Sequence, residues 1–223
     1  ASTGDPRQLL DISRQQDDYR AVVAWVRRAE GIDPDRSVLW GSSFSGGHVL
    51  VVAAGDPRIA AVIAQAPFTD SLPVIRRMSV RNLLRASAFG LADRVGALAG
   101  RPPVRMPAVG PSGSFAALTE PDAESGYAAL RGPQSLWRNE FAARLILRFP
   151  AFRPVRYAAR LGMPVLFCVC DHDTTTPPGS TIRAAREAPR GELRRYPYGH
   201  FAIYRDPQVK VDQVEFLQRV VGT

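Results

Sequence analysis

The chain contains 223 residues, of which 45% are hydrophobic and 22% are charged. This composition is typical of a globular protein that is long enough to bury a core without disulfide bonds. Its two cysteines exclude a disulfide-rich scaffold, and no apolar run approaches the roughly 18–20 residues that cross a membrane. The first residues, Ala1–Asp5, lack the basic head and the apolar stretch of a signal peptide.

The basic charge balance does not indicate a nucleic-acid-binding protein. The formal net charge is +8, with 29 lysines and arginines in total. Lys210 is the only lysine, which together with the abundant alanine is typical of a GC-rich coding sequence. The arginines are scattered in pairs such as Arg27-Arg28 and are not gathered in a run with aromatic residues between them. We therefore expect no nucleic-acid partner.

Strand and helix patterns alternate at both ends of the chain. Apolar residues that recur every three or four positions predict helices, and short apolar runs between turn residues predict buried parallel strands. In chain order we expect a helix over 11–31, a strand over 37–40, a helix over 48–54, strands over 60–64 and 165–169, a helix over 181–188, a strand over 193–196 and a helix over 208–221. In the first helix, the predicted apolar face consists of Tyr19, Val22, Val23 and Val26. The alternation indicates an α/β fold with a parallel sheet.

The middle of the chain breaks this alternation. Helices are predicted over 72–98 and 136–149, with a segment rich in proline and glycine, Gly100–Gly113, between them. The whole stretch is too long for an ordinary connection, so the sequence predicts an inserted helical cap. The predicted division of the chain is therefore a first core part (1–70), the cap (71–161) and a second core part (162–223).

Four large apolar residues of the predicted cap recur at helical spacing: Trp137, Phe141, Leu145 and Phe149. The simplest interpretation is that they pack in the core of the cap. The alternative is that they line an apolar substrate pocket.

A serine-rich turn follows the first predicted strand and precedes a helix. Such a turn lifts a serine hydroxyl clear of the sheet, and small residues on both sides let the helix approach the strand. Ser43 has Gly41 two positions before it, and the backbone N–H of Phe44 can donate to an oxyanion at the helix N-terminus. Ser45 is the alternative nucleophile, since Gly47 follows it by two. An ordinary turn and helix cap without reactivity is the other interpretation.

A serine nucleophile needs a base, and the chain offers three histidines. His48 lies within the helix after the turn, where we expect a structural role. His172 adjoins an acidic residue in the chain, and neighbouring side chains diverge. His200 follows the last predicted strand in a glycine-supported loop, and we therefore favour it as the base.

The imidazole in turn needs a carboxylate that fixes its tautomer. Asp173 follows the strand at 165–169 and is the preferred candidate. Asp171 lies closer to the strand end and would only shape the turn, and Asp70 is a more distant alternative. The order Ser43, Asp173, His200, each after a parallel strand, puts all three at one edge of the sheet.

These segments resemble those of the α/β-hydrolase superfamily over nearly the whole chain. Gly-Ser-Ser-Phe-Ser-Gly-Gly at 41–47 resembles the nucleophile elbow, Asp173 before Thr-Thr-Thr-Pro-Pro the acid turn, and Gly199-His200-Phe201 the histidine loop. The resemblance implies a catalytic triad and a cap that shapes the pocket for the acyl or leaving group. It further implies an esterase-like serine hydrolase acting on a small acyl substrate, or a related peptidase or acyltransferase, without metal or organic cofactor.

The chain departs from the family pattern before the elbow. The family sheet has about four strands ahead of the elbow strand, and the loop after the third donates a second oxyanion N–H. We expect this chain to hold only the C-terminal portion of that fold, with an exposed apolar edge at Val38–Trp40. Loss of one oxyanion donor typically lowers the rate by ~10²–10³-fold. Either the chain is an excerpt of a longer enzyme, or a homo-oligomeric or other partner covers the edge. The alternative function is a non-catalytic binding module.

The two cysteines, Cys168 and Cys170, lie two residues apart on one strand face, where a disulfide bond would be strained. No further cysteine–histidine cluster completes a zinc site. We interpret them as core residues of a reduced, cytoplasmic protein, and expect no membrane partner.

Overall fold

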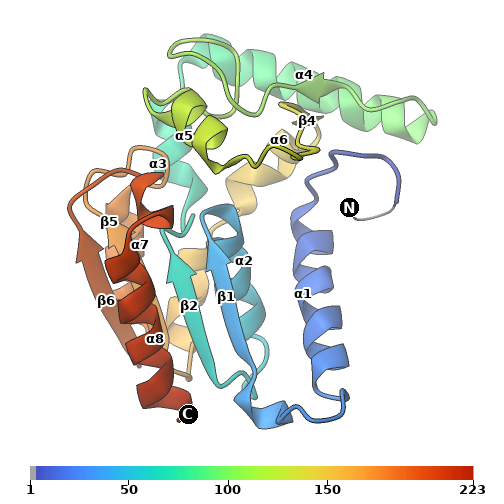
Figure 1. The fold of residues 1–223 in the computed structure, drawn as a ribbon. Coiled ribbons are helices and arrows are strands. Elements are labelled where there is room, and N and C mark those ends of the chain that lie inside the picture. Colours follow the sequence, from blue (N-terminus) through green and yellow to red (C-terminus); the bar gives the residue numbers. More distant parts are fainter. Residues whose placement is uncertain (1–3, 223) are drawn as a thin grey trace. The chain divides into compact units, whose positions relative to one another are not determined.

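The structure, a computed structural model, describes residues 4–222. Of the first residues considered above as a signal peptide, Ala1–Thr3 therefore lie outside the described residues. The described chain divides into two compact units (Figure 1). We call residues 13–71 and 152–222 the core unit, and residues 4–12 and 72–151 the insertion unit. The predicted cap, 71–161, overlaps the insertion unit over 72–151, and its role as a cap stays a prediction.

The core unit contains a four-stranded parallel sheet. Its strands are β1 (Val38–Ser42), β2 (Ala61–Gln65), β5 (Val165–Cys170) and β6 (Gly191–Tyr196), in the spatial order β1-β2-β5-β6. All four strands predicted from the sequence are therefore confirmed. Among the described residues β1 is an edge strand, with Trp40 half exposed.

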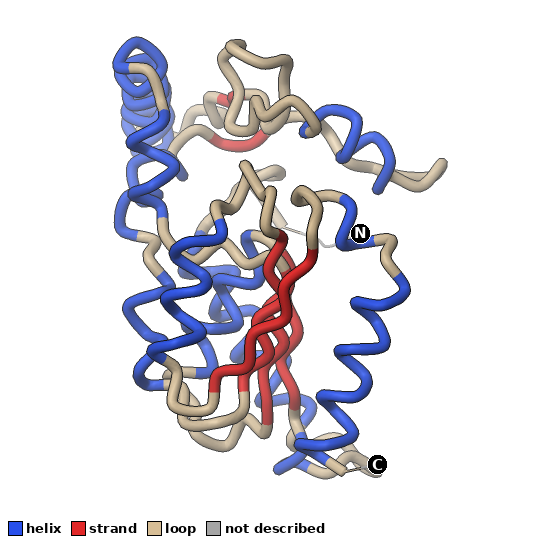
Figure 2. The backbone as a smooth tube through the Cα atoms, turned by 90° about the vertical axis from the view of Figure 1, so that its left-hand side faces the viewer, coloured by secondary structure: helices blue, strands red, loops and turns tan. Residues whose placement is uncertain are grey.

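Helices cover both faces of this sheet, as the nearly edge-on view in Figure 2 shows. They are α1 (Ile12–Val26), α2 (Phe44–Ala53), α7 (Pro178–Glu187) and α8 (Pro207–Val221), with short 3-10 helices at Pro34–Arg36, Pro154–Arg160 and Ala202–Tyr204. Residues of α1, α2, α7 and the 154–160 turns pack in one apolar cluster, and residues of α8 pack in the other.

The strand β5 shows how the sequence builds both clusters. Alternate side chains of a strand point to opposite faces. Phe167 accordingly lies in the cluster with α2 and α7, whereas Cys168 and Cys170 lie in the cluster with α8. Both cysteines are free and buried, as predicted for core residues. Burial raises the pKa of Cys168 to about 11 and that of Cys170 to about 12, so both remain protonated thiols at neutral pH.

Three details of the core unit differ from the sequence prediction. Helix α1 ends at Val26 and not near Gly31. Helix α2 begins at Phe44 and not at His48, because Ser45, Gly46 and Gly47 are already helical. In α1 only Val23 is buried, and Val22 is 59% exposed. Adjacent residues of a helix point about 100° apart, so Val22 and Val23 cannot both face the sheet squarely.

The insertion unit consists of one helix of 19 residues, several shorter helices and one pair of short strands. Its elements are α3 (Ser71–Arg77), α4 (Val80–Leu98), β3 (Arg105–Met106), α5 (Ala123–Leu130), β4 (Phe141–Ala142), α6 (Leu145–Arg148) and a 3-10 helix at Phe149–Ala151. Strands β3 and β4 pair antiparallel. No helix among the described residues is both long and apolar enough to cross a membrane.

The two long helices predicted in the insertion need correction. The helix over 72–98 is interrupted after Arg77, and α4 restarts where the side chain of Ser79 accepts a hydrogen bond from the backbone N–H of Asn82 at 3.2 Å. Of the helix predicted over 136–149, only Leu145–Arg148 (α6) is α-helical, and the part before it is not. There the side chain of Asn139 bonds both the N–H and the C=O of Val109, at 2.8 and 2.7 Å, which fixes an extended connection before β4.

Because 136–149 is not one helix, the four apolar residues of the predicted stripe have different roles. Phe141, Leu145 and Phe149 line an apolar cavity of about 120 Å³ within the insertion unit. Trp137 instead stacks on Tyr127, with ring centroids 5.5 Å apart.

Candidate functional site

The turn between β1 and α2 holds Ser43 in a strained backbone conformation. Its φ of 54° and ψ of −121° lie outside the regions that non-glycine residues ordinarily adopt. Two backbone hydrogen bonds fix the turn: the N–H of Ser43 donates to the C=O of Gln65 at 2.9 Å, and the N–H of Phe68 donates to the C=O of Ser43 at 2.8 Å. The end of β2 and the loop that follows it therefore hold Ser43 in this strained conformation.

The glycines of the turn are required by close backbone contacts. A Cβ atom on Gly41 would lie 2.5 Å from the carbonyl oxygen of Ser45. A Cβ atom on Gly47 would lie 2.3 Å from the carbonyl oxygen of Phe68. Only glycine lets α2 approach the end of β1 and the loop after β2 this closely.

The side chain of Ser45, the alternative nucleophile, is used within the turn. Its Oγ donates to the C=O of Ser42 at 2.8 Å and accepts from the N–H of Ser42 at 3.0 Å. This explains how a serine is tolerated at a position where the resemblance implies glycine: the hydroxyl closes the turn. Ser43 is the serine whose hydroxyl contacts a histidine.

Ser43, His200 and Asp173 form a continuous series of hydrogen bonds. His200 Nε2 lies 3.0 Å from Ser43 Oγ, and His200 Nδ1 lies 2.7 Å from Asp173 Oδ2. His200 and Asp173 are 3% and 4% exposed, so the carboxylate and the imidazole are shielded from water. The structure thus brings together the three residues that the sequence favoured.

Thr176 holds the carboxylate of Asp173, a role that the sequence analysis missed. The backbone N–H of Thr176 donates to Asp173 Oδ1 at 2.6 Å, and Thr176 Oγ1 donates to Asp173 Oδ2 at 2.8 Å. The same hydroxyl also lies 3.1 Å from the C=O of Ala66 and 3.3 Å from His200 Nδ1. Part of the signal was present in the sequence, since aspartate side chains often bond the backbone of a following residue in a turn.

The other acidic candidates have different partners. Asp171 accepts a hydrogen bond from Arg195 at 2.8 Å on the surface. Asp70 is buried and accepts two hydrogen bonds from Arg153, at 2.8 and 2.9 Å. Neither carboxylate bonds His200.

The other histidines are also accounted for. His172 is exposed. His48 is buried, with Nε2 3.1 Å from the side-chain oxygen of Gln15, and it packs against the rings of Phe44 and Phe152. Burial lowers the pKa of His48 from 6.5 to about 4, which keeps the imidazole neutral. The predicted structural role of His48 is confirmed.

Polar side chains link the elbow to α8. Ser42 Oγ donates to the hydroxyl of Tyr204 at 2.8 Å and accepts from Gln65 Nε2 at 3.2 Å. Gln65 Oε1 in turn accepts from Gln213 of α8 at 2.8 Å. These residues join segments far apart in the chain, so a reading of local patterns could not associate them.

Phe44 lies at the position expected of an oxyanion donor. It is the first residue of α2, so its backbone N–H has no acceptor within the helix. The helix N-terminus also carries a partial positive charge. Within residues 4–222 no group of three or more histidine, cysteine or acidic side chains is arranged to hold a metal ion.

Comparisons with known proteins identify relatives of the whole chain. A family model described as X-Pro dipeptidyl-peptidase (S15 family) matches residues 1–103, just under half of the chain. The crystal structure of the α/β hydrolase GrgF from Penicillium sp. sh18 is similar with a TM-score of 0.81, covering 100% of this chain and 77% of GrgF at 23% identity. The quorum-quenching protein AidA of Acinetobacter baumannii is 44% identical over 223 residues, which cover 99% of this chain and 73% of AidA. The chain belongs to the α/β-hydrolase superfamily.

This α/β hydrolase is also similar to a polyketide transferase of Stachybotrys chlorohalonatus, with 37% identity over 114 residues, 50% of this chain and 36% of the transferase. The predicted fold class is confirmed. The relatives support an α/β-hydrolase-type enzyme.

Proposed function

We propose that the protein is a serine hydrolase that cleaves a carboxylic ester or a related acyl bond through Ser43, His200 and Asp173. The single observation that carries the proposal is the pair of distances at His200: 3.0 Å from Nε2 to Ser43 Oγ and 2.7 Å from Nδ1 to Asp173 Oδ2. A base hydrogen-bonded to a hydroxyl and oriented by a carboxylate is the arrangement that nucleophilic catalysis by serine needs.

Acylation starts with attack of Ser43 Oγ on the substrate carbonyl carbon. His200 Nε2 takes the hydroxyl proton, and the carbonyl oxygen gains a negative charge that the N–H of Phe44 stabilises. Asp173 keeps the Nδ1 proton on the imidazole and stabilises the imidazolium. The tetrahedral intermediate then expels the alcohol, which receives the proton from Nε2, and leaves an ester on Ser43.

Deacylation repeats these steps with water as the nucleophile. His200 removes a proton from water as the water oxygen attacks the acyl carbon, and it returns the proton to Ser43 Oγ when the acid leaves. No proton acceptor other than the imidazole is required.

Acyl transfer is the second candidate function, in which an alcohol or amine acceptor replaces the water. The similarity to a polyketide transferase favours it. The two activities share the acyl-enzyme, so product analysis with a competing alcohol distinguishes them. Hydrolysis yields the free acid alone, whereas transfer yields an ester of the added alcohol.

The triad is tested by labelling with a fluorophosphonate, which phosphonylates an activated serine. We expect one label per chain on Ser43, and none after Ser43→Ala or His200→Ala. Ser45→Ala and His172→Gln are the matched controls, and both should still be labelled on Ser43. Labelling that persists in His200→Ala, or that maps to Ser45, would contradict the proposal.

A further inference from the structure

Helix α4 of the insertion unit presents a continuous apolar stripe to solvent. Its members are separated by three or four residues, all are exposed, and we call them the α4 stripe: Val80, Leu84, Ala88, Leu91, Val95 and Leu98. Four of the six are leucines or valines with exposed fractions between 57% and 72%, and Leu98 reaches 77%. At 100° per residue, this spacing keeps all six on one narrow face of the helix.

The stripe lies opposite the side on which α4 packs. The buried residues of the helix are Ala86, Gly90 and Asp93, which belong to the other face. A surface helix normally turns its apolar residues toward the core and its polar residues toward water. Single exposed leucines are common, but a contiguous apolar face of this length marks an interaction site.

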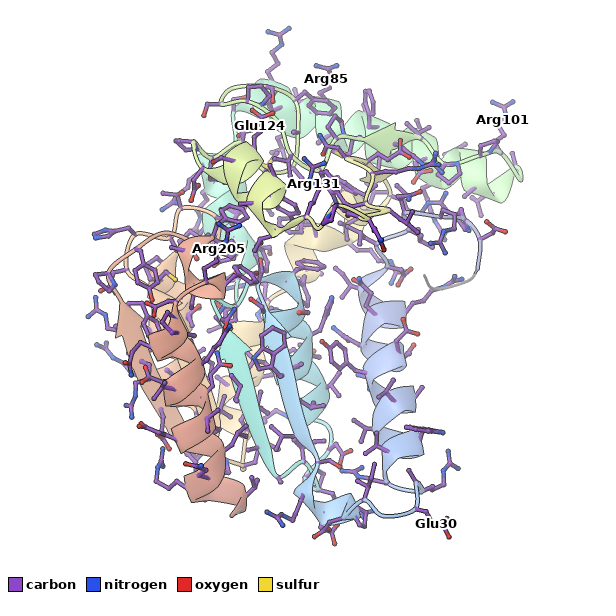
Figure 3. The ribbon with its side chains drawn as sticks, in the orientation of Figure 1. Glu30, Arg85, Arg101, Glu124, Arg131 and Arg205 are labelled. Atoms are coloured by element: carbon purple, nitrogen blue, oxygen red, sulfur yellow. The ribbon has the colours of Figure 1, made fainter. Side chains whose placement is uncertain are left out.

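Arginines surround the stripe. Arg81 and Arg85 lie along one side of the stripe on the same helix, and Arg94 lies on its other side. Three more arginines flank the ends of the helix: Arg76, Arg77 and Arg101. Figure 3 shows Arg101 projecting outward from the insertion unit, whereas the guanidinium of Arg85 lies over the ring of Phe115, 4.1 Å from its centroid. Arg105 and Arg144 form ion pairs within this unit, and among the described residues no ion pair involves the six arginines around the stripe.

The exposed charged side chains of α4 are all positive. Asp93 is the only acidic residue of α4, and it is buried in an ion pair with Arg144 at 2.7 Å. The solvent side of α4 therefore combines an apolar centre with a positive margin. Its occupant must be apolar in the middle and anionic at the edges.

A second copy of the chain fits this surface poorly. Two stripes packed together would bring like-charged arginines of both copies alongside each other, which is unfavourable. A helix of 19 residues is about 28 Å long, and one helix face covers less than the roughly 800 Å² per partner of a standard interface. Both considerations favour a surface that supplies negative charge over a wide area.

We propose that α4 binds the surface of a lipid bilayer that contains anionic lipids. The α4 stripe would enter the boundary between headgroups and acyl chains, and the arginines would contact the headgroup phosphates. A helix that lies in the interface needs no membrane-spanning segment. The sequence expectation of no membrane partner considered only spanning segments. The proposal does not depend on the chemistry of Ser43.

The test is flotation of the full chain with vesicles of phosphatidylcholine, with and without phosphatidylglycerol. We expect flotation with the phosphatidylglycerol vesicles only, and loss of binding at high salt. The double variant L84E/L91E should lower the bound fraction by about tenfold or more, because two charges would enter the acyl boundary. R81Q/R94Q should weaken binding at low salt.

Matched controls separate the stripe from general effects. Leu136→Glu alters another highly exposed leucine of the insertion unit (79% exposed) and should bind like wild type, as should Arg186→Gln of α7. All variants should melt at the wild-type temperature, because each changes exposed side chains.

Three results would overturn the proposal. The first is no flotation of the wild type with anionic vesicles, and the second is equal flotation of L84E/L91E. The third is a dimer in sedimentation velocity that L84E/L91E dissociates, which would assign the α4 stripe to a second copy of the chain.

Discussion

At the scale of single residues, the imidazole of His200 is held from both sides. Asp173 bonds one ring nitrogen and Ser43 the other, while Thr176 bonds both oxygens of the carboxylate. The orientation of the base thus depends on a side chain that does not contact the substrate. Thr176 is therefore a positioning residue.

Replacing Thr176 by valine tests that role. Thr176→Val keeps the backbone N–H bond to Asp173 but removes the hydroxyl bond to a charged acceptor, which is worth about 1.5–3 kcal/mol. We expect kcat for ester hydrolysis to fall about 10–100-fold with KM nearly unchanged. Thr176→Ser should restore most of the activity. A change confined to KM, or no recovery in the serine variant, would argue against positioning.

Burial of His48 predicts a pH dependence of stability. Its pKa is lowered from 6.5 to about 4 in the folded protein, so between these values the unfolded chain binds a proton that the folded one excludes. Stability from this group is therefore complete above pH 6.5 and is lost as the pH falls toward 4, by about 3 kcal/mol in total.

Chemical denaturation of two histidine variants at several pH values checks this effect. The free energy of unfolding should fall less steeply below pH 6.5 in His48→Gln than in wild type. His172→Gln, which changes the exposed histidine, should follow the wild-type curve. Parallel curves for wild type and His48→Gln would show that His48 is not the titrating group.

At the scale of elements, the elbow depends on the close approach of α2 to the loop after β2. In Gly47→Ala the new Cβ atom would lie 2.3 Å from the carbonyl oxygen of Phe68 and 2.9 Å from Pro154, so backbone must move. We expect a loss of about 2–3 kcal/mol in the free energy of unfolding, together with slower labelling of Ser43. Urea denaturation measures the loss in the free energy of unfolding, and the rate of fluorophosphonate labelling measures the effect on Ser43.

Gly179 of α7 provides the control for that substitution. A Cβ atom there has no neighbour within 4 Å, so Gly179→Ala should be neutral or stabilising by up to about 1 kcal/mol. If Gly47→Ala were equally well tolerated, the close approach would not limit the elbow.

The core elements could be predicted because local pattern and tertiary role coincide there. The run Val165–Val169 is apolar on both faces, as a strand covered on both sides must be. The prediction failed in the insertion unit, where local pattern and tertiary contacts conflict. The apolar spacing of residues 136–149 fits a helix, but the hydrogen bonds of Asn139 to Val109 hold the segment before β4 in an extended conformation. Such a bond joins residues 30 positions apart and leaves no local signal.

The candidate site could likewise be predicted only where local pattern and tertiary role coincide. Ser43, Asp173 and His200 each follow a predicted strand, so topology alone brings them to one edge of the sheet. The Ser42–Gln65–Gln213 series could not be foreseen, because side-chain partners across the sheet depend on register.

At the scale of the whole molecule, one buried ion pair ties the insertion unit together. The carboxylate of Asp93 in α4 accepts bonds from the backbone N–H of Val104 before β3 and from the backbone and guanidinium of Arg144 before α6. Burial raises the pKa of Asp93, but the bonds from Arg144 and Val104 outweigh it and hold the pKa below 3.8.

Asp93→Asn should therefore destabilise the insertion unit by about 3 kcal/mol, since it leaves Arg144 without its charged partner. The wild-type contribution is complete above pH 3.8 and is lost as the pH falls through the lower folded pKa, so the difference between the two proteins should shrink in acid. Asp122→Asn, at a helix start where the side chain makes no capping bond, is the control. Hydrogen exchange of α4 amides at two pH values measures the effect, and equal exchange in Asp93→Asn and wild type would refute it.

The central claim is that Ser43 carries the acyl group during turnover. Rapid mixing of the full chain with a nitrophenyl ester, followed by peptide mapping of the quenched protein, tests it most directly. We predict a burst of one nitrophenolate per chain and an acyl group on Ser43, both absent in Ser43→Ala and His200→Ala. An acyl group on another residue, or turnover that survives Ser43→Ala, would contradict it.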